Sequence, residues 1–188
     1  TVEKVMSLWR KGEKVVVFCH YIETGRALRR AISFRMRQEI HQIAVEKIGS
    51  GDSESAAKRL ENLGDEFFDK DNAVRRRFDE LARAMVAAKG PDLSPKDVDL
   101  VVDVMRRYVR TPAFLARFFP LKLDPVPGDV DAAFEAEDGS ELSLRHIFEG
   151  FIVFIAKRCR QAERDDYLTA LDRLQTGSHL VAKSRRLD

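Results

Sequence analysis

Residues 14–19, Lys14-Val15-Val16-Val17-Phe18-Cys19, contain five consecutive apolar residues, nearly all β-branched or aromatic. A glycine turn at Gly12 precedes them and polar residues follow them. A short, continuous apolar run between turn signals predicts a strand that is buried on both faces of a parallel sheet. The interpretation of the fold starts from this strand.

After the predicted strand, the spacing of apolar residues changes to the period of a helix. From Thr24 onward an apolar stripe recurs every three or four residues, with Thr24 as the expected N-cap and Lys47 near the expected end. At about 1.5 Å per residue this helix would span roughly 36 Å, which is more than a small sheet needs to be covered. We therefore expect it to leave the sheet and enter a helical subdomain.

The sequence beyond this helix predicts helices almost throughout. They are expected over residues 54–68, 72–88, 95–109, 112–118 and 163–174, with a weak second strand at 178–183. The segment 144–159 is apolar around most of its circumference, so it is expected to be the central helix of the helical part. The expected core residues there are Ile147, Phe148, Phe151, Ile152 and Ile155. The predicted fold class is mostly α with a small α/β part.

Composition excludes several classes of protein. The chain has 188 residues, 44% of them hydrophobic and 34% charged, which is too apolar for a disordered chain, and it has no run long enough to cross a membrane. Basic residues (33) nearly balance acidic ones (31), so any nucleic-acid surface must be a local patch. The two distant cysteines fit a reducing, cytoplasmic compartment. The end at residues 184–188 reads like the start of a helix, so we expect a piece of a longer protein.

Residues 12–28 resemble the opening of the second RecA-like lobe of superfamily 2 helicases and Swi/Snf-type translocases. In that family a helix precedes a VxVF strand, and a short polar loop then leads into a helix with a threonine-like cap; the order here is the same. Residues 109–121 resemble a helical insertion of some large bacterial helicase-like proteins. The resemblance implies a fragment of a RecA-like parallel sheet lobe over 1–35, an all-helical insertion over 36–174, and a return to the lobe over 175–188.

The same resemblance implies a function. The parent protein would be an ATP-dependent helicase or translocase acting on DNA or RNA, with ATP and magnesium as its cofactors. This chain contains neither the GxxxxGK[ST] motif nor the QxxGRxxR arginine-finger motif, so we expect no cofactor and no catalytic residue in the chain itself. Its partners would be the rest of the helicase chain and the nucleic acid, and the helical insertion is a candidate for binding a protein.

In the family that the sequence resembles, the loop after the strand grips the sugar-phosphate backbone. That loop corresponds here to His20, Tyr21, Thr24 and Gly25, with Arg26 adding charge. A parallel strand delivers its C-terminal loop to the ligand-binding edge of the sheet, and the next helix offers free N–H groups there. The alternative is structural: Thr24 only caps the helix, and Tyr21 packs at the sheet edge.

Arginine-rich helices are a second candidate for nucleic-acid contact. Arginines crowd one helix at positions 26, 29, 30, 35 and 37 and two others at 75–77 and at 106, 107 and 110. Aspartates and glutamates are interleaved with the last two groups, so we expect those groups to be neutralised by salt bridges.

Two other classes of function are weighed against the helicase interpretation. One is a helical protein-interaction module on a small α/β scaffold. The other is a Rossmann-like nucleotide-binding protein, which is disfavoured because the strand-to-helix turn lacks GxGxxG. The four histidines have no metal-ligand spacing, so no metal site is expected.

Overall fold

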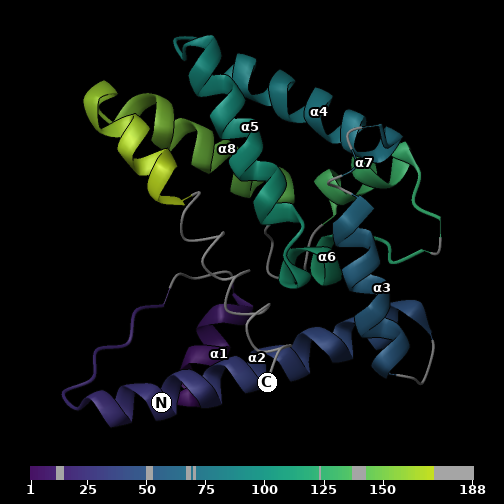
Figure 1. Ribbon diagram of the computed structural model, residues 1–188, viewed down its shortest axis with the longest axis vertical. Coiled ribbons are helices and arrows are strands. Elements are labelled where there is room, and N and C mark those ends of the chain that lie inside the picture. Colours follow the sequence, from purple (N-terminus) through teal and green to yellow (C-terminus); the bar gives the residue numbers. More distant parts are fainter. Residues whose placement is uncertain are drawn as a thin grey trace.

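The computed structural model describes residues 1–11, 15–49, 53–66, 69, 71–122, 124–136 and 143–171. These ranges are mostly helical, and none of them contains a β-strand (Figure 1). The helices are α1 (Val2–Arg10), α2 (Ile22–Ile48), α3 (Ser53–Glu66), α4 (Ala73–Lys89), α5 (Pro95–Val109), α6 (Pro112–Phe118), α7 (Pro127–Glu135) and α8 (Leu144–Val153). A short π-helix, η1 (Phe154–Arg158), continues α8, and residues 161–171 form a further helix.

The prediction of a RecA-like parallel sheet lobe, and with it of a small α/β part, was wrong. Residues 15–19 form an irregular segment on the surface, where Val16 is 65% exposed and Phe18 is 93% exposed. A strand is stable only when a neighbouring strand pairs with its backbone, and within the described ranges no other strand does so. The apolar run therefore has strand-forming composition without a sheet to join. The return to the lobe predicted for residues 175–188 lies outside the described residues.

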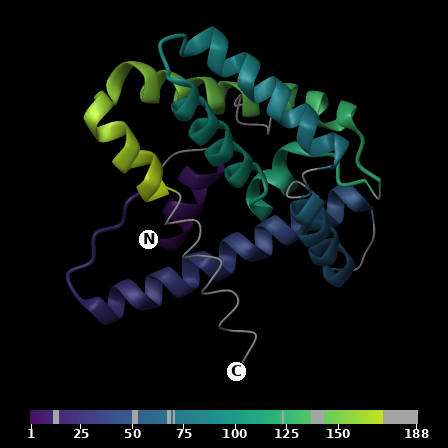
Figure 2. The same ribbon diagram turned by 45° about the horizontal axis from the view of Figure 1, so that its top comes forward.

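The long helix predicted after this segment is confirmed as α2. It begins at Ile22 with Tyr21 as N-cap, three residues before the expected N-cap, and it crosses residue 35 without interruption. Its last turn ends at Gly49, whose φ of 69° is the left-handed conformation that glycine adopts without strain. Only its second half is buried, at Ile40 and Ala44, where α1, α3 and α6 pack against it. Its first half lies at the edge of the molecule (Figures 1 and 2).

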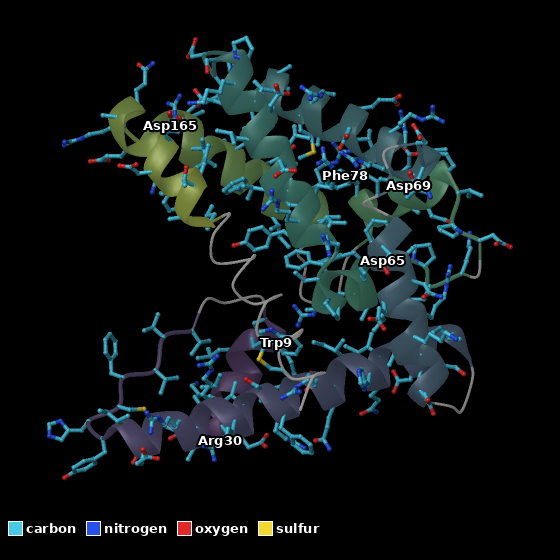
Figure 3. All side chains as sticks on the ribbon, in the orientation of Figure 1. Trp9, Arg30, Asp65, Asp69, Phe78 and Asp165 are labelled. Carbon is cyan, nitrogen blue, oxygen red and sulfur yellow. The ribbon has the colours of Figure 1, made fainter. Side chains whose placement is uncertain are left out.

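The helices pack in two groups: α1, α3 and α6 contact α2, and α5, α7 and α8 contact α4. The core of this second group is centred on α4. Three buried rings meet there: Phe78 of α4, which is labelled in Figure 3, Phe134 of α7 and Phe148 of α8, with centroids 5.6 to 6.2 Å apart. The predicted central helix does contribute Phe148, Ile152 and Ile155 to the core, but Ile147 and Phe151 are only partly buried. The core is therefore not centred on α8 alone, and α5 adds buried side chains to it, among them Val101, Val102 and Met105.

Contacts of charged side chains connect helices that are distant in the sequence. At the start of α5, the Ser94 hydroxyl accepts a hydrogen bond from the Asp97 N–H. The buried Asp97 carboxylate forms an ion pair with Arg164 of the helix at 161–171, at a distance of 3.2 Å. At the other end of the molecule, the Arg117 guanidinium of α6 lies 4.2 Å from the ring centroid of Trp9, the residue labelled on α1 in Figure 3.

We predict that replacing Phe148 with alanine lowers the free energy of unfolding by about 3–5 kcal/mol, because the ring is fully enclosed and leaves a cavity. Phe154, which is 38% exposed, is the matched control, and its replacement with alanine should cost less than about 1 kcal/mol. Denaturant unfolding followed by circular dichroism measures both. Equal losses in the two variants would contradict the position assigned to the core.

Candidate nucleic-acid interface

The residues predicted to contact nucleic acid lie at the start of α2. His20 and Tyr21 precede the helix and are both exposed, Tyr21 by 71%, and their rings meet edge to face with centroids 5.3 Å apart. Thr24, Gly25 and Arg26 follow within the first turns of the helix. The structure therefore brings all five predicted residues to one end of one helix, at the surface of the molecule.

The backbone of this helix end differs from the prediction in one respect. Thr24 was expected to be the N-cap, but it lies within the first turn, and the Gly25 N–H donates to the Tyr21 carbonyl at 3.0 Å. The four N–H groups that an α-helix leaves without an intrahelical acceptor are therefore those of residues 21–24. The argument from a sheet edge no longer applies, because the described residues contain no sheet to provide that edge.

Basic side chains continue from this end along α2. Arg26, Arg29, Arg30 and Arg37 are all exposed, and at 100° per residue they lie within one third of the helix circumference. They extend over about 16 Å of the helix axis. Figure 3 places Arg30 on the part of α2 that lies away from the α4 and α5 helices. We call these four arginines the α2 arginine row.

The charges of this row are only partly matched. Arg26 pairs with Glu23 at 2.5 Å, and Arg37 donates to the carbonyl of Ser33. Neither Arg29 nor Arg30 forms an ion pair with any residue that the structure describes. Because no acidic residue occurs between positions 24 and 38, the row presents an excess of positive charge to solvent.

Four of the six arginines that were predicted to be neutralised pair with carboxylates, namely Arg75, Arg77, Arg106 and Arg107, whereas the exposed Arg76 forms no ion pair with any residue that the structure describes. Arg77 of α4 reaches Asp131 of α7 at 2.6 Å and Glu80 at 3.1 Å, and these hydrogen bonds raise the pKa of Arg77. Arg106 of α5 pairs with Asp79 and Asp103, both within 3 Å. Arg145 pairs with Glu135. The α2 arginine row thus differs from these groups in that Arg29 and Arg30 have no ion pair with a described residue and no acidic residue occurs between positions 24 and 38.

Sequence reasoning named Arg26 but gave the loop precedence over the remaining arginines of α2. The signal that identifies them is the absence of acidic residues over positions 24–38, which is visible in the sequence. Three aromatic side chains within α2 or shortly before it are also exposed: Phe18 is 93% exposed, Tyr21 71% and Phe34 58%. Sequence reasoning had expected Phe18 to be buried in a sheet, which concealed this part of the surface.

Metal and membrane chemistry receive no support from the described residues. No group of three or more metal-ligating side chains occurs among them. In the same ranges, no helix combines the length and the apolar character that crossing a bilayer requires. Comparisons with protein families, curated proteins and solved structures found no match to this chain.

Two glycines at opposite ends of α2 give a direct test of its boundaries. A Cβ at Gly25 would contact the Cys19 side chain at an ordinary 3.5 Å, so Gly25→Ala should stabilise the chain by about 0.5 kcal/mol through lower entropy of the unfolded state. At Gly49 the positive φ makes alanine strained, so Gly49→Ala should destabilise by about 1 kcal/mol. Thermal unfolding measures both. The same sign for the two changes would contradict one of the helix ends.

Proposed function

We propose that this chain is a nucleic-acid-binding part of an ATP-dependent helicase or translocase, and that its contact surface is the start of α2. The contact residues would be His20, Tyr21, Thr24, Gly25 and Arg26, extended by the remaining arginines of the row. The observation that carries the proposal is the row itself: it has an excess of positive charge, whereas most of the arginines described above on α4, α5 and α8 are paired with carboxylates.

The physical basis is the recognition of a phosphate backbone. Arginine guanidinium groups bind phosphate oxygens as forked donors, and a helix N-terminus adds free N–H groups and a partial positive charge. Exposed aromatic rings next to such a row are the arrangement that binds single strands, because bases stack on them without sequence preference. The helicase part of the proposal rests on the sequence resemblance of residues 12–28 alone, since residues 15–19 do not form the strand of that family. DNA and RNA satisfy this chemistry equally well.

ATP hydrolysis belongs to groups outside this chain. The sequence has no phosphate-cradling GxxxxGK[ST] loop and no QxxGRxxR arginine-finger segment, so ATP and magnesium would be bound by other parts of the parent protein. We place the parent in the cytoplasm, which agrees with the two free cysteines, Cys19 and Cys159.

A second candidate function is a helical protein-interaction module. The observation that favours it is the exposed apolar segment at residues 15–22, where Val16, Phe18 and Ile22 are each more than half exposed. Contiguous exposed apolar side chains often mark a protein contact. Nucleic-acid binding that depends on the arginines distinguishes the first function from this one.

We predict that changing Arg29 and Arg30 together to alanine weakens the binding of a fluorescein-labelled oligo(dT) strand in an anisotropy titration. The slope of log K against log salt should fall by about 0.7 for each lost phosphate contact. The matched control changes Arg83 and Arg145 to alanine, which removes the same charge from exposed arginines that already have carboxylate partners. If the control loses as much affinity, binding follows net charge and the α2 arginine row is not the site.

We also predict that the purified chain does not hydrolyse ATP, with or without oligo(dT), because it contains neither of the two motifs named above. A coupled-enzyme assay measures the turnover, and a helicase with both motifs serves as the positive control. Turnover that is stimulated by the oligonucleotide would overturn the assignment of ATP chemistry to other parts of the parent.

A further inference from the structure

A groove of about 930 Å³ lies where the end of α2 meets α3 and the chain that links α6 to α7. Apolar groups form much of its lining, namely the side chains of Ile48, Phe118 and Leu121 and the methyl groups of Ala132 and Ala136. It begins about 15 Å along α2 from Arg37, so its role does not depend on the arginine row.

Three cations line the same groove, and no carboxylate is found among its described lining residues. Lys122 is matched from outside the groove by Asp129, 2.7 Å away. Burial alone would raise the pKa of Asp129, but hydrogen bonds from Lys122 and from the Val126 N–H outweigh this effect and lower it. The third cation, Arg59, is 91% buried and belongs to the wall of the groove.

The remaining cation of the lining, Lys47, differs from Lys122 and Arg59 in its polar contacts. Its ammonium donates to the carbonyl oxygens of Arg117 and Phe119, at 2.6 and 3.3 Å, and no described carboxylate lies within ion-pair distance. Burial lowers its pKa, since a positive charge in this position is only partly hydrated. An anionic group of a ligand beside the Lys47 ammonium would stabilise its positive charge in place of water. The adjacent apolar groups would favour a ligand that also has an apolar part.

We propose that this groove binds an acidic peptide segment of a partner protein, with an apolar side chain of the peptide against Ile48 and Ala132 and a peptide carboxylate beside Lys47. The volume is at the upper end of pockets for small molecules, about 300–1,000 Å³, and the groove is open to solvent, as peptide sites are. A nucleic acid fits less well, because aliphatic groups and methyls line the groove and the charge of Lys122 is already matched.

The test uses a short fluorescein-labelled peptide of leucine and glutamate, titrated with the whole chain and followed by anisotropy. Ala132→Trp fills the groove from an exposed position and should abolish binding. Lys47→Gln removes the unmatched charge and should weaken binding roughly tenfold, the loss expected for one charged hydrogen bond. A second peptide has glutamine in place of glutamate and therefore lacks the carboxylate. Its affinity for the unchanged chain should be about as low as the affinity of the acidic peptide for Lys47→Gln.

Matched controls are Ala87→Trp, an exposed alanine on α4, and Lys58→Gln, an exposed lysine on α3 outside the groove lining. Both should keep the affinity of the unchanged chain, and thermal unfolding confirms that each variant is folded. The proposal is overturned if the acidic peptide does not bind, if the controls lose binding as the test variants do, or if oligo(dT) displaces the peptide. The last result would leave the function proposed for α2 intact, and loss of oligo(dT) binding in the Arg29 and Arg30 variant does not bear on the groove.

Discussion

The packing of Phe78, Phe134 and Phe148 is the interaction on which the second group of helices depends. The three rings come from α4, α7 and α8, which are far apart in the chain, and all three are at most 2% exposed. Large enclosed rings contribute several kcal/mol each, a sizeable share of the stability of a small domain. α5 is positioned by α4, and α6 follows α5 after a single turn, so the face that α6 offers to α2 is set by this packing.

The parts of the fold that the sequence predicted correctly are those determined by local chemistry. The start of α5 is set by Ser94, Pro95 and Asp97, and the predicted and observed helices coincide at 95–109. The apolar run at residues 15–19 was interpreted wrongly, because a strand depends on pairing partners that the run does not itself contain. Of the five core residues expected between positions 147 and 155, Ile147 and Phe151 are only partly buried, since an apolar helix does not indicate which of its faces its neighbours cover.

The candidate site could also be predicted only in part. Its local features follow from the sequence, whereas the pairing of its charges depends on how the chain folds. The sequence alone predicted a long helix with Thr24 as its N-cap and with several arginines, and the observed N-cap, Tyr21, lies three residues earlier. Whether an arginine remains unmatched depends on residues that are distant in the chain: Arg77 is neutralised across 54 positions by Asp131, and Arg106 across 27 positions by Asp79. Interleaved acids correctly suggested that Arg77 and Arg106 would be neutralised, but only the folded arrangement identifies their partners and shows that Arg29 and Arg30 have none among the described residues.

α2 combines these two kinds of constraint in a single helix. An isolated helix of the length of its exposed first half would be marginal in water, because nucleation is costly and no packed face offsets it. Here the second half is already nucleated and held by α1, α3 and α6, so the exposed turns need only propagate from it. A ligand that binds the arginine row then meets a formed helix and spends little of its binding energy on ordering the backbone. The buried half of α2 would therefore support the proposed binding at the exposed half without contacting the ligand.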